Sequence, residues 1–182
     1  METVPPNAKL VMSALFSDIK AEPLLFRILE HEVGSVDLVG ERMPFTHSQY
    51  YREEMGSTLH RRVLSFRGLV APDALLQAKL DAQFLEDRLR GANGLRTVNL
   101  DPAIMGLHNF VLATHKGYAH RIYLGRGVYG DLTLIYRKGS FTALEWTYPD
   151  YASPVMIDLL NLIRSVYLWQ RRQRMAGEAN AP

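Results

Sequence analysis

The sequence predicts an α+β fold: a single-domain split βαβ (ferredoxin-like) sheet with an added C-terminal β-hairpin and a closing helix. The periodic segments follow in the order strand, helix, strand, strand, helix, strand, which is the order of a split βαβ arrangement. The pair Lys138-Gly139 forms a two-residue turn between two strand-like runs. The length of 182 residues, without repeats or a linker, indicates one domain with its helices over one sheet face.

The first part of the chain predicts a strand, a helix and an extended segment. Residues 1–8 are expected to be a loose lead-in, and residues 9–174 are expected to form the domain. Lys9–Phe16 is an almost continuous apolar run, which is typical of a buried strand. Ala21–Val33 has apolar residues at helical spacing and ends before Gly34, and Ser35–Met43 is expected to be extended.

The middle of the chain predicts a long loop, a strand and a helix. Pro44–Thr58 is long for a turn, and a loop rich in aromatic and carboxylate residues is a frequent place for function. Leu59–Leu69 predicts a strand. Pro72–Arg90 is the clearest helix, because it has a first-turn proline and apolar residues at helical spacing. The predicted apolar stripe consists of Leu76, Leu80, Phe84 and Leu89.

The last part of the chain begins with the pair Asp101-Pro102, which resembles a helix cap followed by a first-turn proline. Ala103–Ala113 could therefore be a short helix, although the same apolar run is compatible with a strand. A closing helix is predicted from Ser153-Pro154 to about Gln173, with a disordered tail at residues 175–182. Between these elements, strands are predicted at Arg121–Tyr123, Tyr129–Arg137 and Ser140–Trp146.

Polar side chains on these strands predict a site. Successive side chains of a strand point to opposite faces. In the segment Arg96–Asp101, which is also expected to be extended, Asn99 therefore shares a face with Asp101, and in Tyr129–Arg137 Asp131 shares one with Thr133. Arg121 and Tyr123 likewise share a face. A polar sheet face is either exposed to water or lines a cleft.

We predict that this polar face, covered by the Tyr50–Gly56 loop, binds a small anionic ligand, phosphorylated molecules included. Arg121 and Lys116 would hold the anion, since the arginine fork can pair with two oxygens. Asp131 or Asp101 would be the catalytic acid or base. The other predicted ligand-binding residues are Asn99, Tyr123, Thr133, His120, Tyr51, Glu53 and Glu54.

Each of the acidic residues also has a structural interpretation. Asp101 could cap a helix, and Asp131 could pair with Arg121 across two strands. Glu53 and Glu54 could lie on a solvated turn. The sequence alone does not decide between these interpretations and the functional ones.

Several familiar chemistries lack their motifs. The sequence has no phosphate-binding P-loop, and Gly125-Arg126-Gly127 is best explained as a turn. None of the six histidines has metal-ligand spacing, and no G-x-S-x-G nucleophile motif is present. The absence of cysteine excludes disulfides and thiolate metal sites. The sequence therefore predicts no metal site and identifies no cofactor.

The composition is that of an ordinary globular protein, with 47% hydrophobic and 22% charged residues. The net charge of +2 makes no case for nucleic acid or an anionic membrane. No signal peptide is recognisable, and no stretch approaches the roughly 20 apolar residues of a membrane-spanning helix. We therefore expect a cytoplasmic protein.

Five blocks of the chain, spread from about Lys9 to Tyr167, resemble the prokaryotic domain of unknown function 4416 family. They read PFTHSQYYREEMG, HRRVLSF, RTVNLDPAIMGLHNFVLATHK, AHRIYLGRGVYGDLTLIYRKGSF and EWTYPDY. The chain departs from the family pattern at Ala103, where a glycine would be expected after Asp101-Pro102. The resemblance implies a fold but no reaction. Members have been labelled GTP-binding, which the absence of a P-loop and of an N-K-x-D motif does not support here.

Two other functions remain open. RNA could bind through arginines on the predicted strand Leu59–Leu69 and on the last helix, namely Arg61, Arg62, Arg164, Arg171, Arg172 and Arg174. Alternatively, an exposed sheet edge or the last helix could make the protein an interaction module. The sequence does not identify the ligand, the reaction or the oligomeric state.

Overall fold

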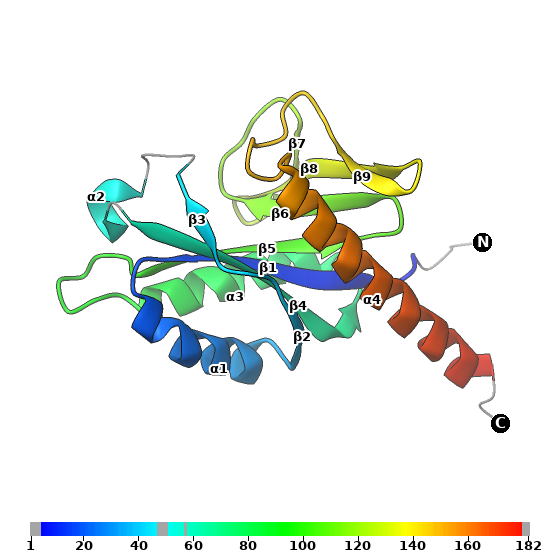
Figure 1. Ribbon diagram of the computed structural model, residues 1–182, viewed down its shortest axis with the longest axis horizontal. Coiled ribbons are helices and arrows are strands. Elements are labelled where there is room, and N and C mark those ends of the chain that lie inside the picture. Colours follow the sequence, from blue (N-terminus) through cyan, green and yellow to red (C-terminus); the bar gives the residue numbers. More distant parts are fainter. Residues whose placement is uncertain (1–4, 47–50, 57, 180–182) are drawn as a thin grey trace.

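The computed structural model describes residues 5–46, 51–56 and 58–179. Within these residues, nine strands form one open antiparallel sheet in the order β2-β4-β1-β5-β6-β8-β7, with β3 beside β4 and β9 beside β8 (Figure 1). The strands are β1 (Ala8–Phe16), β2 (Val36–Val39), β3 (Met43–Phe45), β4 (Leu59–Val70), β5 (Val98–Met105), β6 (Asn109–Thr114), β7 (Arg121–Gly125), β8 (Val128–Arg137) and β9 (Ser140–Ala143). The helices are η1 (Ile19–Ala21, a 3-10 turn), α1 (Glu22–Glu32), α2 (Arg52–Met55), α3 (Ala74–Arg88) and α4 (Pro154–Ala179).

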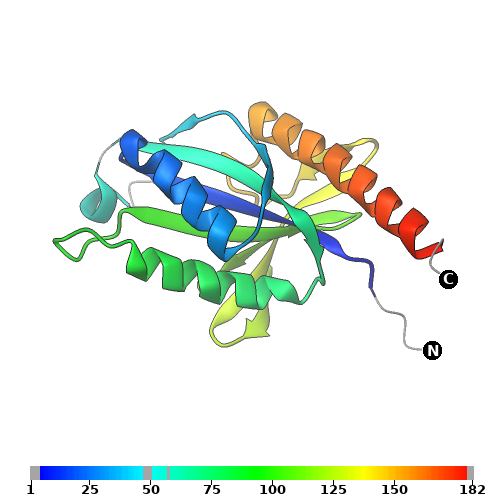
Figure 2. The same cartoon turned by 90° about the horizontal axis from the view of Figure 1, so that it is seen from below.

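Strand β1 is buried along its whole length, as its apolar run predicts. Its side chains alternate between two cores. Leu10 and Met12 pack with residues of α1 and α3 on one face of the sheet, whereas Val11 packs with α4 on the other. Figure 2, which views the molecule from below, shows α1 and α3 side by side in front of the strands.

Helix α4 covers the face opposite α1 and α3, so the prediction that the helices lie over one sheet face is wrong for this helix. Met156, Leu160, Ile163 and Tyr167 are buried at helical spacing and hold α4 on the sheet. The hydroxyl of Tyr167 donates to the backbone oxygen of Asn7 at 2.7 Å. The helix continues to Ala179, beyond its predicted end near Gln173.

The predicted helix at Ala103–Ala113 is wrong, and the strand alternative is confirmed. Asp101-Pro102 lies inside β5, where Pro102 pairs with Met12 of β1. Residues 103–113 form the end of β5, a turn and most of β6. The local cap pattern is overridden because pairing with β1 extends over all of β5.

Strand β6 pairs with β5 only from Ala103 to Met105, so the two strands diverge before Pro102. In the diverging part, the free backbone groups of Leu100 bind side chains of α3. Its N–H donates to Glu86 at 2.6 Å, and its carbonyl accepts from Lys79 at 3.0 Å. The N–H direction alternates along a strand, so position 102 faces the same edge as Leu100, and proline has no N–H to offer there.

The buried face of α3 is shifted from the predicted one: Leu76, Leu80 and Leu89 of the predicted stripe are partly buried against the cores, but they lie at its margin. The stripe that faces the sheet is Leu75, Lys79, Ala82, Leu85 and Glu86. Phe84, which was assigned to the apolar stripe, is 61% exposed. Two charged residues replace apolar ones on the buried face because β5 supplies partners for both.

Two further segments test the sequence prediction. Pro44–Thr58 is more than a loop, since it contains most of β3 and the short helix α2. The hairpin turn between β8 and β9 is confirmed: Lys138 and Gly139 have φ angles of 52° and 87°, as a two-residue hairpin turn requires.

Candidate functional site

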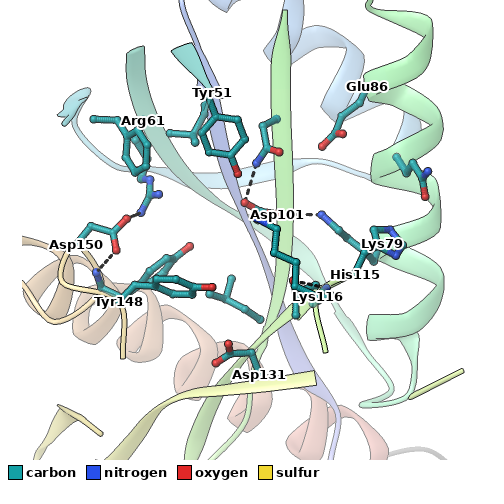
Figure 3. A pocket seen from close by; sticks show the side chains of 18 of the residues that line it. Tyr51, Arg61, Lys79, Glu86, Asp101, His115, Lys116, Asp131, Tyr148 and Asp150 are labelled. Atoms are coloured by element: carbon teal, nitrogen blue, oxygen red, sulfur yellow. Dashed lines mark hydrogen bonds and ion pairs between the residues drawn. The ribbon is translucent and has the colours of Figure 1, made fainter. Parts of the chain in front are cut away.

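A cavity of about 320 Å³ lies where β5 and β6 diverge. Its wall is formed by α3, β4, β5, the strands β6 and β8, and the segment 148–151 before α4 (Figure 3). The predicted juxtaposition of polar groups from separate strands is therefore present. The cavity exists because the β5–β6 ladder is interrupted and side chains, instead of a neighbouring strand, occupy the free edge of β5.

Arg61 enters the cavity from β4 and is only 6% exposed. Its guanidinium carbon lies 4.7 Å from the ring centroid of Phe45 and 5.1 Å from that of Tyr151. Its Nη1 forms an ion pair with Asp150 at 2.5 Å. Within the described part of the chain, however, Nε has no hydrogen-bond partner. A buried arginine with unused N–H groups is a potential anion ligand.

Asp101 is held at the centre of the site by two neighbours. Lys79 donates to its Oδ1 at 2.9 Å, and the amide of Asn99 donates to its Oδ2 at 2.7 Å. Burial tends to raise the pKa of Asp101, but the charge and hydrogen bond of Lys79 outweigh burial and hold the pKa below its ordinary value. Asp101 is therefore ionised at neutral pH.

Glu86 projects into the same cavity from α3, and its pKa is shifted the opposite way. Burial raises the pKa of Glu86, and the hydrogen bond from Leu100, together with Lys79, offsets burial only in part. Its second oxygen is 4.0 Å from Nη1 of Arg96, which donates its hydrogen bond to Asn99 instead, at 2.9 Å. The cavity thus contains two carboxyl groups with separated pKa values, a pattern found in acid–base sites.

Asp131 lines the cavity from β8 and is 2% exposed. It accepts from Nε of Arg121 at 2.8 Å and from Oγ1 of Thr133 at 3.1 Å, and it lies 3.3 Å from Nε2 of His120. The other nitrogens of Arg121 donate to the backbone oxygen of Lys116 and to the hydroxyl of Tyr148. Arg121, His120 and Thr133 do not line the cavity themselves, but their contacts with Asp131 fix the position of its carboxylate.

The sequence-predicted residues are partly brought together. Five of them line the cavity: Tyr51, Asn99, Asp101, Lys116 and Asp131. Glu54 lies 3.4 Å from Nε of Arg96. Tyr123 is on the outer strand β7 and is 59% exposed, with its ring against Tyr129. Tyr50 and the side chain of Glu53 lie outside the described residues.

Sequence reasoning missed Lys79 and Glu86 and considered Arg61 only for RNA binding, although each of the three breaks a pattern. Arg61 lies on the buried face of β4 between Leu59 and Val63. Lys79 and Glu86 are seven residues apart, which places both on the face of α3 that carries Leu75. The sequence did contain a signal for these residues: each is charged although its spacing from apolar neighbours assigns it to the core.

Two of the arginines considered for RNA binding, Arg62 and Arg164, are tied into the fold. Arg62 pairs with Glu22 and donates to the carbonyl of Gly40. Arg164 donates to the carbonyl of Leu107 at 3.0 Å, and its guanidinium lies 3.4 Å from the ring centroid of Tyr136. The outer strand β7 exposes the apolar side chain of Ile122. An exposed sheet edge of this kind is what the interaction-module hypothesis requires, and that hypothesis stays a prediction.

The described residues include no group of three histidine or acidic side chains placed to hold a metal ion. None of the helices in the described ranges is both long and apolar enough to cross a membrane.

Comparison with known proteins returns one family model, described as a domain of unknown function (DUF4416), which matches residues 6–167. No curated protein and no solved structure matches the chain.

Proposed function

The chain belongs to the DUF4416 family, and from that premise we propose that it binds a small molecule with an anionic group, a carboxylate or a phosphate, in the cavity between β5 and β6. The volume of about 320 Å³ suits a small metabolite rather than a polymer. We further propose that Asp101 and Asp131 are the acid–base residues of an enzymatic activity that converts the bound molecule.

The observation that carries this proposal is the environment of Arg61. A buried arginine requires compensation for its lost hydration. Asp150 balances its charge and contacts Nη1, but Nε still has no hydrogen-bond acceptor among the described residues. The rings of Phe45 and Tyr151 lie 4.7 Å and 5.1 Å from the guanidinium carbon. The N–H groups of a guanidinium point outward in its plane, so an acceptor binds at its edge. An oxyanion can do so and accept two N–H groups at once.

Arg61 fits the anion-binding role better than Arg121. The nitrogens of Arg121 bind Asp131, Tyr148 and the backbone of Lys116, so an anion would have to displace these partners. We therefore propose Arg61 as the anion ligand and Arg121 as a positioning residue. Lys116 and Asn99, which line the cavity, remain proposed ligand contacts.

The strand order also supports a split βαβ arrangement, which we propose as the fold type. Strands β1 and β2 both run antiparallel to β4, which lies between them, and α1 connects them. Strands β4 and β5 both run antiparallel to β1, and α3 connects them. Each unit thus has two strands of the same direction, with a third of opposite direction between them.

The test is calorimetric titration of the protein with sulfate, with Arg61→Lys as the variant. Lysine keeps the positive charge but lacks the planar fork, so we expect affinity to fall about tenfold to a hundredfold, as for the loss of one or two charge-assisted hydrogen bonds. Arg164→Lys is the matched control, because Arg164 also lies against an aromatic ring and has an unpartnered Nε within the described structure. Equal sulfate affinity of wild type and Arg61→Lys, or no binding by the wild type, contradicts the proposal.

A further inference from the structure

We propose that Glu86 is a neutral carboxylic acid that donates a hydrogen bond to the bound ligand, at the end of the cavity away from Arg61. This inference rests on the proposed function and specifies its ligand class. The ligand has an anionic group for Arg61 and a second oxygen, of a carboxylate, carbonyl or phosphoryl group, that accepts the proton of Glu86.

The contacts of Glu86 favour the neutral form. The residue is 9% exposed, and the hydrogen bond that it accepts comes from the backbone N–H of Leu100 at 2.6 Å. Lys79, the cation on the same helix face, donates to Asp101 and to the Leu100 carbonyl. A buried carboxylate with so few donors is poorly stabilised.

The other charged groups around Glu86 do not reverse this preference. Arg96 favours ionisation, but its Nη1 is 4.0 Å away, and its Nε faces Glu54 at 3.4 Å. The charge of Asp101 disfavours a second negative charge nearby. Burial is the largest influence, and the pKa of Glu86 lies above its ordinary value.

The positions of these groups suggest how a ligand would lie. Glu86 and Lys79 project from α3 on one side of Asp101, whereas Arg61 and Asp150 lie on its other side (Figure 3). A molecule held at Arg61 that extends past Asp101 would place its second oxygen near the Glu86 hydroxyl. Ionised Glu86 would repel that oxygen, so binding requires the proton.

Two probes of different length test this inference: sulfate, which occupies the Arg61 end only, and succinate, a short dicarboxylate that can span the cavity. We expect the affinity of the wild type for succinate to fall, by as much as tenfold per pH unit, as the pH rises above the pKa of Glu86, because one proton is bound with the ligand. In Glu86→Gln the amide still donates a hydrogen bond but does not titrate. Its succinate affinity should therefore stay constant over the same range, and sulfate affinity should be similar in both proteins.

A ligand-free measurement accompanies the titrations. The carbon-13 signal of the Glu86 carboxyl group, assigned by its absence in Glu86→Gln, should titrate above the ordinary range of glutamate. A signal that titrates at or below that range overturns the inference. So does succinate binding with the same pH dependence in both proteins, or no tighter than sulfate binding. If sulfate itself does not bind the wild type, the proposed function fails, and this inference fails with it.

Discussion

Lys9 is completely buried in β1, although it is charged. Its ammonium forms an ion pair with Asp37 of β2 and donates to the side chain of Gln170 in α4 at 2.7 Å. Asp37 also accepts from Ser65 of β4 at 2.6 Å. Burial raises the pKa of Asp37, but the hydrogen bonds from Lys9, Ser65 and Gln170 outweigh it, and the pKa lies below its ordinary value. Four elements therefore depend on one buried charge pair.

Replacing Lys9 by methionine should lower the free energy of unfolding by about 3–5 kcal/mol at neutral pH, because Asp37 loses its compensating charge. The lowered pKa of Asp37 contributes stability above its unfolded pKa, and this stability is lost as the pH falls through the folded pKa. The difference between wild type and Lys9→Met should therefore shrink in acid. Urea unfolding at pH 7 and at about pH 3 measures it. Lys20→Met, at an exposed lysine, is the control. If wild type and Lys9→Met differed by the same free energy of unfolding at both pH values, the stabilising charge pair between Lys9 and Asp37 would be contradicted.

Predictability from sequence differed among single residues for a physical reason. Asp131 was recognisable because an acidic residue inside a strand pattern is unusual, and its cross-strand partner Arg121 lies in an adjacent segment. The alternative interpretation of Asp101 as a helix cap is wrong, and the sequence could not exclude it because the partner, Lys79, lies on a helix 22 residues away. Local patterns reveal local partners, whereas the ion pairs of the cavity join residues that only the folded sheet brings together.

Helix α3 should respond to substitution according to its observed face. Leu85→Ala should lower the free energy of unfolding by about 2–5 kcal/mol, because Leu85 is 3% exposed and its loss leaves a cavity. Phe84→Ala should cost less than about 1 kcal/mol, because Phe84 is 61% exposed and the Arg88 guanidinium lies 5.6 Å from its ring centroid, an exposed cation–π contact. Urea unfolding of the two variants compares the faces directly. If Phe84→Ala lowered the free energy of unfolding more than Leu85→Ala does, the observed buried face would be wrong and the face predicted from sequence would be correct.

At the scale of elements, strands with uniform patterns could be predicted, and those with interrupted pairing could not. The runs that became β1, β4 and β8 show strand character in their own residues. The β5–β6 hairpin has no such signal, because the same residues fit a helix cap and a proline N-terminus. Its strand form depends on β1 and β8, to which β5 and β6 are hydrogen-bonded. The cavity arises at this hairpin, so its shape could not be predicted from local patterns, and its helix wall carries Lys79 and Glu86 at positions where apolar periodicity expects core residues.

At the scale of the whole molecule, α4 connects the two parts of the sheet that the cavity separates. Its buried residues share one core with Val11 and Val63 of β1 and β4 and with Phe110 and Leu134 of β6 and β8. Strands β1 and β5 contribute at the same time to the opposite core under α1 and α3. The two parts of the sheet are joined by the shared core under α4 and by a smaller cluster in which Leu75 of α3 packs with Ala113 of β6 and Val128 of β8.

This sharing predicts that the chain unfolds in a single cooperative transition. Trp146 reports on β8, because its indole nitrogen donates to the carbonyl of Leu132 at 2.8 Å and its ring stacks on His120. In a Trp169→Phe variant, which removes the exposed tryptophan of α4, fluorescence should reflect Trp146 alone, whereas far-ultraviolet circular dichroism reports on all helices and strands. The two urea curves should coincide in midpoint and slope. A fluorescence transition at lower urea would show that β6 to β9 unfold separately, and that the cavity lies between two independent units rather than inside one.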